Sequence, residues 1–417
     1  MKVFSINDIC EIKSGKRIPL GFDFVDYKTP HPYIRARDIK NGNINTDDLI
    51  FLEENTYNKI KKYIINENDI AITIVGASIG DVGFAQKNVD GFNLTENAVR
   101  LTHFNDKANS KYVYYLLIQK QYKELMQTIA GGAAQPKLGI YKIQKIKVCL
   151  PSLHDQEKIA SILSAYDNLI ENNNKRINIL EQMAENLYKE WFVRFRFPGH
   201  ETTPFENGIP KGWKYVCFSE MFDYTRGVSY SSEEIECEEG ENLVNLKNIQ
   251  GFGGFRRDGT KKFNGKYKLN QMVKEHDLIM GVTDMTQDRR TVGAVALVPK
   301  IDGVISADLI KICSSMSNIF SYCMFRWGAY SAYISQFGNG ANVIHLKPDS
   351  IKNIKILKPS DVIIEMFVKI AEPIIENINR LNVQNDNLIK QRDLLLPRLM
   401  SGKQEISNGR NNERYSK

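Results

Sequence analysis

The chain has 417 residues, of which 42% are hydrophobic and 25% charged, and its formal net charge is +7 with a pI near 8.8. This composition excludes a disordered protein, and the length is sufficient for two domains of ordinary size. The mild excess of positive charge is compatible with a nucleic-acid partner, and equally with a basic protein that binds none.

The cysteines and the apolar runs bear on the cellular compartment. The six cysteines are scattered, with no C-x-x-C pair and no histidine at metal-ligand spacing, so we expect reduced thiols in a cytosolic protein and no metal or other cofactor. The first segment, MKVFSINDIC, has no apolar signal core, and no run of about 18 apolar residues occurs. We expect neither export nor a membrane partner.

Residues 1–152 are predicted to form a mixed α/β domain. Short β-type runs at 32–34, 69–75 and 98–101 alternate with Gly and Asn turns, and one helical stretch covers 110–129.

Residues 153–195 carry a heptad pattern whose apolar positions alternate four and three apart, as in the a/d seam of a coiled coil. The seam residues are Ile159, Leu163, Tyr166, Ile170, Asn173, Ile177, Leu180, Ala184, Leu187 and Trp191. Asn173 is a polar interruption of the kind that fixes register at some cost in stability. Residues 196–212 then contain Pro198, Gly199, Pro210 and Gly212, and we interpret them as a linker.

Residues 213–360 repeat the α/β pattern, with strands predicted around 243–246, 277–280 and 294–298 and a helix near 317–336. Residues 361–400 carry a second heptad seam, which consists of Phe367, Ala371, Ile374, Ile378, Leu381, Asn385, Leu388, Arg392 and Leu395. Pro373 cannot donate a helical hydrogen bond, so either it opens the long helix as a first-turn residue or a short helix precedes a bend there. Residues 401–417 lack apolar content and are predicted to be disordered.

The chain contains an internal repeat, in which the second half follows the pattern of the first. The stretch LGIYKIQKIKVCLPS at 138–152 returns 208 positions later as LKPDSIKNIKILKPS at 346–360. Other landmarks match in the same order: Gly15 with Gly227, Asp69 with Asp277, Gly83 with Gly293, and Gly132 with Gly340. A repeat this long predicts two domains of one fold rather than a solenoid.

The two heptad helices are expected to pair with each other, the alternative being that each packs only on its own domain. In an antiparallel pair the second helix returns the chain along the first. A parallel pair would instead require the linker to run back along the whole rod with no slack for structure. We therefore expect the antiparallel arrangement.

Two similar domains on a rigid spacer suit a ligand that offers two sites, such as duplex DNA, whose half-sites on one face lie about 34 to 36 Å apart per helical turn. Arg and Lys near strand ends and turns could contact phosphates, and Arg could also contact guanine edges, whereas the alternative for each is an ordinary solvated cation. The candidates are Lys13, Lys16, Arg17, Arg35, Arg37, Lys40 and Lys137 in the first half, and Arg226, Lys247, Arg256, Arg257, Arg289 and Arg290 in the second.

One aligned pair of turns suggests two different half-sites. The run YIRARDIKNG aligns with the segment at 243–249, which sets Arg35 and Arg37 against Asn245 and Lys247. Arg prefers guanine edges and Asn prefers adenine, so different side chains at equivalent positions would read different sequences. The alternatives for Arg35 and Arg37 are phosphate contacts or a cap on the turn beside Asp38.

Motifs of common DNA enzymes are missing from the sequence. No Pro-Pro occurs, so the Asn/Asp-Pro-Pro-Tyr/Phe signature of an adenine methyltransferase is absent, as is G-x-x-x-x-G-K-[ST]. The run GFGG at 251–254 lacks the spacing of G-x-G-x-x-G, and the histidines pair with no obvious nucleophile. We expect binding without catalysis.

The chain resembles the specificity subunit of type I restriction-modification enzymes over nearly its whole length. The segments that carry the resemblance are GWKYVCFSEMFDYTRG at 212–227, YIRARDIKNG, DIAITIVGASIGDVG at 69–83, and LPSLHDQEKIASILSAYDNLIENNNKRINILEQMAENLYKEWF at 150–192. The second copy departs from the pattern, because it lacks the DQEK run of 155–158.

The resemblance implies two target-recognition domains that alternate with two antiparallel helical regions. Each domain would read one half of a bipartite DNA sequence, and the helices would set the spacer and dock two modification subunits. Restriction subunits would join the same complex, and the chain itself would be non-catalytic. The alternative from another class is an assembly scaffold with paired helices and no DNA specificity.

Overall fold

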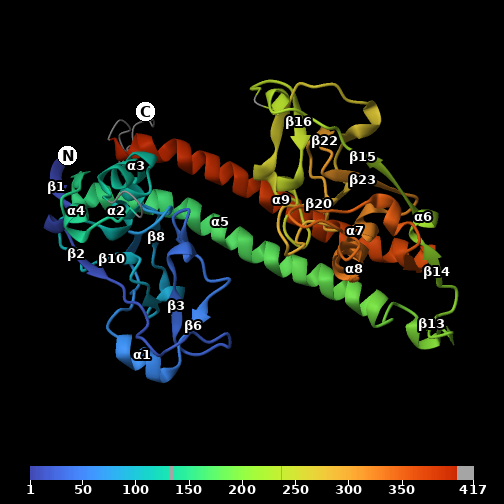
Figure 1. The fold of residues 1–417 in the computed structure, drawn as a ribbon, viewed down its shortest axis with the longest axis horizontal. Helices are drawn as coiled ribbons and strands as arrows, with labels where there is room; N and C mark the ends of the chain where they lie inside the picture. The colour runs from blue at the N-terminus through green and yellow to red at the C-terminus, as the bar shows by residue number, and fades with distance from the viewer. Residues whose placement is uncertain (132–135, 236, 402–417) are drawn as a thin grey trace, which may run out of the picture. The chain divides into compact units, whose positions relative to one another are not determined.

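The computed structural model describes residues 1–131, 136–235 and 237–401. It divides into two compact units: unit 1 contains Met1–Ile170 and the chain from Asp386 onward, and unit 2 contains Glu171–Asn385. Each unit combines sheets and helices, so the prediction of mixed α/β structure is confirmed. The long helices α5 (Leu153–Tyr188) and α9 (Asp361–Met400), green and red in Figure 1, contribute residues to both units.

The main sheet of unit 1 has four antiparallel strands in the order β2-β10-β7-β8. Their bounds are β2 Glu11–Ser14, β10 Ala98–Thr102, β7 Ile70–Thr73 and β8 Val82–Phe84. Every residue of β7 and β10 is buried, including Arg100, whose Nη1 lies 3.0 Å from Oδ2 of Asp69. A buried cation needs such a partner, because an unpaired charge inside the core would be strongly destabilising.

Shorter elements surround this sheet. A three-stranded sheet has the order β6-β3-β9, and β4-β5 and β1-β11 form two-stranded pairs. Their bounds are β6 Ile50–Phe51, β3 Pro32–Ile34, β9 Asn93–Leu94, β4 Ile39–Lys40, β5 Asn43–Ile44, β1 Lys2–Ser5 and β11 Lys147–Leu150. The short helices are α1 Glu54–Ile60, α2 Ser110–Leu117, α3 Lys120–Ile129 and α4 Ile140–Gln144.

Unit 2 has the same strand order in its main sheet, β15-β23-β19-β21, and a β14-β25 pair in the place of β1-β11. The bounds are β15 Phe222–Arg226, β23 Leu309–Ser314, β19 Leu278–Gly281, β21 Val295–Leu297, β14 Lys214–Cys217 and β25 Lys355–Lys358. Such agreement in strand order is what two copies of one fold would give.

Further strands of unit 2 form the β17-β16-β22-β18 sheet and the β20-β24 pair. Their bounds are β17 Lys261–Phe263, β16 Glu241–Val244, β22 Gly303–Ile305, β18 Met272–Val273, β20 Thr283–Asp284 and β24 Ile344–His345. The short helices are α6 Phe218–Met221, α7 Asn318–Trp327 and α8 Tyr330–Ser335.

Each domain helix expected from the sequence is broken into two. The stretch 110–129 forms α2 and α3, with Gln119 extended at the break (φ −65°, ψ 142°). The stretch 317–336 forms α7 and α8, with Ala329 in the left-handed region (φ 62°). The sequence did not reveal these breaks, because apolar residues continue at helical spacing on both sides of them.

In unit 1 the first part of α5 lies against the last part of α9. Asp167 pairs with Arg392 through a 2.7 Å contact between Oδ1 and Nη1. Nearer the start of α5, Leu163 shares a hydrophobic core with Leu396 and Leu399 near the end of α9. Because the same core contains strand residues, the helices pack on the domain as well as on each other.

In unit 2 the later part of α5 meets the earlier part of α9. Nδ2 of Asn173 donates to Oδ1 of Asn385 at 2.9 Å, and the ring of Tyr188 contacts the ring of Phe367 edge-on. Higher numbers on α5 therefore meet lower numbers on α9 in both units, which confirms the expected antiparallel pair.

Two local expectations need correction or comment. Helix α9 runs unbroken through Pro373, so this proline neither opens the helix nor follows a separate short one. Pro373 is exposed, and water can therefore satisfy the carbonyl that loses its helical partner. Apart from Ser401, the tail 401–417 that was predicted to be disordered lies outside the described residues.

The segment interpreted as a linker is structured. It contains the hairpin β12 (Phe205–Glu206) and β13 (Ile209–Pro210). Phe197, at its start, stacks on Trp213 with ring centroids 5.2 Å apart, and both rings belong to the core of unit 2.

Candidate nucleic-acid interface

The turn after β3 brings Arg35 and Asp38 together. Nε and Nη2 of Arg35 donate to Oδ2 and Oδ1 of Asp38 at 2.9 Å each, and the Arg35 backbone N–H donates to the same carboxylate at 2.8 Å. Arg35 also donates to the Asp48 carbonyl. The hydrogen bonds to Asp38 raise the pKa of Arg35. In the free protein Arg35 therefore caps this turn, and its side chain is only 18% exposed.

The next cations along this turn are more accessible. The Arg37 side chain is 65% exposed and pairs with Asp48 at 3.0 Å, and Lys40 is exposed at the end of β4. Exposed cations with weak or single surface partners can exchange those partners for phosphate at little cost.

Lys13, Lys16 and Arg17 lie around the end of β2. Lys13 pairs with Glu11 at 2.9 Å, and the ammonium of Lys16 lies 5.8 Å from the ring centroid of Tyr63. Arg17 is 77% exposed and its Nε lies 2.6 Å from Oε1 of Glu96, which raises the pKa of Arg17.

The aligned turn of unit 2 has the same backbone cap with different side chains. The Asn245 backbone N–H donates to Oδ1 of Asn248 at 2.9 Å, as Arg35 does to Asp38. The Asn245 amide donates to the carbonyls of Leu243 and Gly259, and its Oδ1 accepts from the Lys247 N–H at 3.0 Å. Asn245 is 5% exposed, so its side chain is committed to the fold and only Lys247 of the pair is exposed.

Three segments of unit 2 converge beside this turn, and we call them the loop cluster: residues 249–256, 284–291 and 335–345. The Phe252 N–H donates to the Arg290 carbonyl at 2.8 Å. Nη1 of Arg289 donates to the Ser335 carbonyl at 2.8 Å, and Nε2 of Gln287 donates to the Ala341 carbonyl at 2.6 Å. The middle loop is thus hydrogen-bonded to both of the others.

Four predicted arginines belong to the loop cluster or border it. Arg256 and Arg290 have side chains 53% and 59% exposed, and each pairs with an exposed carboxylate, Asp258 and Asp288 respectively. Arg289 is half-buried by its bond to Ser335, and Arg257 is half-buried at the start of a 3-10 turn. Arg226 lies apart, at the exposed end of β15.

Asp284 organises the middle loop. Its Oδ1 accepts from the backbone N–H and hydroxyl of Thr286 at 2.8 Å each, and its Oδ2 accepts from the Thr291 N–H at 2.7 Å. Burial alone would raise the pKa of Asp284, but these hydrogen bonds outweigh burial and lower it. The Asp284 carboxylate therefore stays ionised, and its hydrogen bonds to Thr286 and Thr291 close the loop.

Lys137 and His345 occupy equivalent positions in the two units. In unit 1 the backbone of Lys137 pairs in β-bridges with Val75 and Gly131. In unit 2 the backbone of His345 pairs in the same way with Thr283 and Asn339. Both side chains are exposed. The sequence prediction named Lys137 and missed His345, although the repeat itself sets Leu138 against Leu346 and so aligns the residues before them.

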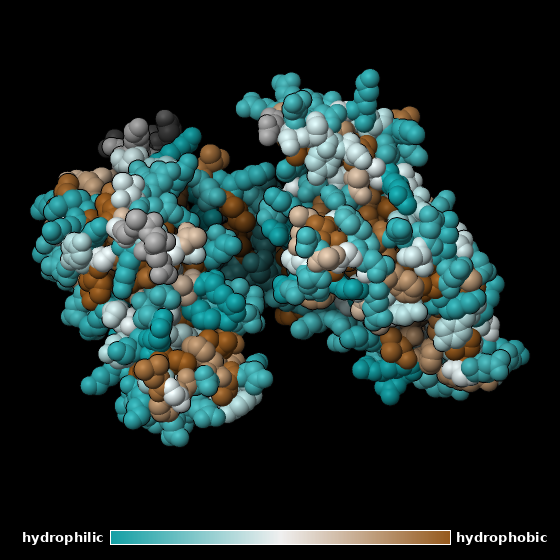
Figure 2. Space-filling model, viewed as in Figure 1, coloured by the Kyte–Doolittle hydropathy of each residue, from teal (hydrophilic) through white to brown (hydrophobic). Residues whose placement is uncertain are grey.

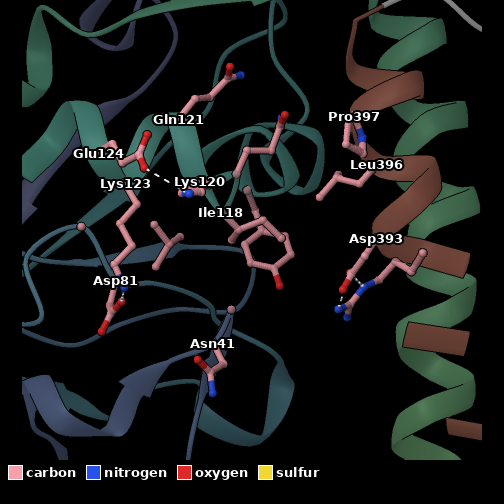
Figure 3. A pocket seen from close by; sticks show the side chains of 16 residues that line it. Asn41, Asp81, Ile118, Lys120, Gln121, Lys123, Glu124, Asp393, Leu396 and Pro397 are labelled. Carbon is pink, nitrogen blue, oxygen red and sulfur yellow. Dashed lines mark hydrogen bonds and ion pairs between the residues drawn. The ribbon is translucent and has the colours of Figure 1, made fainter. Parts of the chain in front are cut away.

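A groove of about 780 Å³ in unit 1 lies between α3, the turn before β8 and the last turns of α9 (Figure 3). Its charged residues are paired: Lys123 with Asp81 at 2.6 Å, Lys120 with Glu124 at 3.6 Å. Asp393, on α9, accepts from Arg392 at 2.8 Å. The groove therefore presents balanced rather than one-signed charge, unlike a phosphate site.

Within residues 1–131, 136–235 and 237–401, no group of three or more His, Cys, Asp or Glu side chains is placed to hold a metal ion. In the same part of the chain, no helix is long and apolar enough to cross a membrane.

Comparison with known proteins shows which family this chain resembles. Residues 1–182 match the model of the type I restriction modification DNA specificity domain. The type I restriction enzyme MjaIX specificity subunit of Methanocaldococcus jannaschii is 29% identical over 72% of this chain and 70% of its own. Residues 1–182 therefore match this specificity-domain family, and the chain is similar to a type I restriction enzyme specificity subunit over about three quarters of its length.

Two further relatives agree along nearly the whole length. The putative type I restriction enzyme MjaX specificity subunit of the same organism is 25% identical over 96% of this chain and 93% of its own. The crystal structure of a type I restriction-modification system S subunit from M. genitalium is 15% identical, covers 95% of both chains and superposes with a TM-score of 0.60, which supports the specificity-subunit fold.

The departure in the second helical region of this chain has a structural explanation. Gln156 is fully buried: its Oε1 accepts from the Asn109 N–H, and its Nε2 donates to the Lys107 and Pro151 carbonyls. It ties the start of α5 to the α2 N-terminus. The aligned residue in α9 is Ile364, which is 5% exposed and joins the hydrophobic core of unit 2. A polar tether in one copy is thus an apolar contact in the other.

The predicted seam positions all lie on the inner side of the two helices. None of them is exposed: each is buried or half-buried. They are Ile159, Leu163, Tyr166, Ile170, Asn173, Ile177, Leu180, Leu187, Ile374, Ile378, Leu381, Asn385, Leu388 and Leu395.

Proposed function

We propose that this chain is the DNA-recognition subunit of a type I restriction-modification complex, with each repeat domain reading one half of a bipartite target. In this proposal the chain divides into recognition domains 1–152 and 213–360, helical regions 153–195 and 361–400, the segment 196–212 and the tail 401–417. The paired helices set the unread spacer and dock two modification subunits, and restriction subunits join the same complex. The chain supplies recognition without catalysis and needs no cofactor of its own.

The observation that carries the proposal is one backbone frame that holds different polar groups in the two units. The exposed cation of the capped turn is Arg37 in unit 1 and Lys247 in unit 2, whereas Arg35 and Asn245 hold the turns themselves. A ligand with two identical halves would favour identical side chains at these positions. Different groups on one frame suit two different half-sites.

The cations of these loops would have distinct tasks. We assign Lys16, Lys40 and Lys247 to phosphates, because a lysine ammonium is a point charge that suits them and these side chains are exposed. Arg37, Arg256 and Arg290 are exposed and hold only surface carboxylates, so they can fork onto phosphate or guanine.

The test is duplex binding by the chain assembled with its modification subunits. The probe is the duplex that carries the methylation site found by sequencing the DNA of cells that express the complex. We expect log affinity to fall linearly with log salt, by about 0.9 for each phosphate neutralised, and scrambling either half-site to abolish specific binding. The control is the modification subunits without this chain.

The scaffold alternative predicts a different result. If the chain only assembles proteins, adding it to the modification subunits leaves duplex affinity, salt dependence and sequence preference unchanged. That outcome would refute the proposed function.

A further inference from the structure

An exposed phenylalanine stands at the tip of a turn in the loop cluster. Phe252 lies between Ile249 and Phe255, which pair as an antiparallel bridge, and it is 71% exposed. The visible face of the molecule is mainly hydrophilic, with apolar side chains in small patches (Figure 2). Among the residues that the structure describes, Phe252 is the most exposed of the large aromatic side chains.

The backbone at Phe252 is strained and firmly held. Its φ is +66°, a left-handed conformation that bulky residues rarely adopt. The Phe252 N–H donates to the Arg290 carbonyl, and the Gly254 N–H donates to the Val295 carbonyl on β21. The next two residues, Gly253 and Gly254, have φ values of +114° and +108°, which glycine tolerates best. A strained backbone conformation and two glycines thus hold the Phe252 ring at the tip of the turn.

The charge around the ring suits a nucleic acid. Arg256 follows the turn in sequence, and the Arg290 carbonyl accepts the hydrogen bond from the Phe252 N–H. Both arginine side chains are more than half exposed. Met285, 69% exposed on the adjoining loop, adds a second apolar side chain to the cluster. Cations flanking an apolar tip could hold phosphates while the tip meets the faces of bases.

Unit 1 has the corresponding turn without the ring. Its β4-β5 hairpin turns through Asn41 and Gly42, both with positive φ, and the Gly42 carbonyl accepts from the Phe84 N–H on β8. Both turns are therefore hydrogen-bonded to the corresponding edge strand of the main sheet. The difference between them is that the longer turn of unit 2 carries Phe252.

We propose that Phe252 inserts its ring against a base step of the half-site read by unit 2 and partly unstacks it. The inference rests on the proposed function and extends it to one residue. An inserted side chain reads how easily a step can be unstacked, so Phe252 adds specificity through deformability rather than through hydrogen bonds. The unit 1 half-site is read without such a wedge.

The main test is Phe252→Ala. The variant is assembled with the modification subunits, and its binding to the duplex that carries the methylation site is measured. Loss of one base–aromatic contact should weaken binding about 5- to 150-fold, with the salt dependence unchanged because no phosphate contact is lost. Phe252→Trp should retain most of the affinity, since tryptophan also stacks. Leu269→Ala is the matched control, because Leu269 is 84% exposed in the same unit and should not affect binding.

A second readout reports insertion directly. 2-Aminopurine is placed at each adenine of both half-sites in turn, and its fluorescence rises where the base is unstacked. Wild type should raise the signal at one step of one half-site, and Phe252→Ala should not. Phe252→Gly should bind DNA as weakly as Phe252→Ala. It should unfold at a higher temperature than Phe252→Ala, because glycine relieves the strain of the positive φ.

The outcomes separate the inference from the function it rests on. Specific binding by wild type with equal binding and equal fluorescence in Phe252→Ala would overturn insertion and leave the function standing. Weaker assembly of Phe252→Ala with the modification subunits, measured without DNA, would also overturn it, by assigning the ring to a protein contact. Absence of specific binding by wild type would overturn both.

Discussion

Asn385→Ala tests the polar pair in the seam of the two long helices. Asn173 Nδ2 donates to Asn385 Oδ1 at 2.9 Å, and Asn385 Nδ2 donates to Asn174 Oδ1 at 2.8 Å. Asn173 and Asn385 are 6% and 7% exposed. Removing one amide leaves the other buried without this partner, which should lower the free energy of unfolding by about 1–3 kcal/mol. Asn173→Ala should cost a similar amount for the same reason.

The double variant decides whether the two amides act as a pair. When both are removed no buried amide is left over, so Asn173→Ala with Asn385→Ala should cost less than the sum of the two single changes by about 0.5–3 kcal/mol. Asn172→Ala is the matched control: this residue is exposed on the same helix, and its replacement should change stability by no more than about 0.5 kcal/mol.

Urea unfolding followed by tryptophan fluorescence is the appropriate assay. All three tryptophans, Trp191, Trp213 and Trp327, lie in unit 2, which also contains Asn173 and Asn385. The signal therefore follows the unit whose stability is changed. Additive single effects, with the double variant equal to their sum within about 0.3–0.5 kcal/mol, would refute the coupling.

Three further predictions concern the loops. Arg35→Ala should cost about 1–3 kcal/mol of DNA binding and relax the preference in one half-site only, whereas equal weakening on all sequences with a lower salt slope would assign Arg35 to phosphate. Asp284→Asn should destabilise unit 2 at about pH 7 by tryptophan-monitored unfolding. Its lowered pKa means that the carboxylate stabilises the fold above its ordinary pKa of 3.8 and loses this effect as pH falls through the lowered value. The difference in unfolding stability between Asp284→Asn and wild type should then become smaller toward about pH 3. A difference that stays constant with pH would contradict the reasoning. Lys137→Ala should weaken all duplexes alike and reduce the salt slope by about one, and a change confined to one half-site would contradict this.

Periodic elements were predictable from the sequence. The run 32–34 coincides with β3, and the two heptad segments became α5 and α9, because apolar spacing directly reports which face is buried. The path of α9 through Pro373 was not predictable, because it depends on whether the proline faces water or the core, and spacing alone does not fix that.

The site was less predictable than the fold. Asn245 was expected to face DNA because it aligns with Arg35, but Gly259, which accepts its amide, reaches it only through the tertiary fold. His345 could have been found, because the repeat aligns it with Lys137. Phe252 could not, because a single Phe in a glycine-rich run gives no signal of its exposure or its φ.

The paired turns show how a duplicated frame can change its surface without losing its fold. Both turns need an acceptor for one backbone N–H, and a carboxylate or an amide oxygen serves equally: Asp38 supplies one and Asn248 the other. The choice constrains the preceding side chain, because a buried carboxylate needs a cation such as Arg35, whereas a neutral amide tolerates Asn245. An arginine introduced at 245 would therefore require aspartate at 248 to be held in the same way. On this frame the capping residue and the side chain that it holds therefore have to change together.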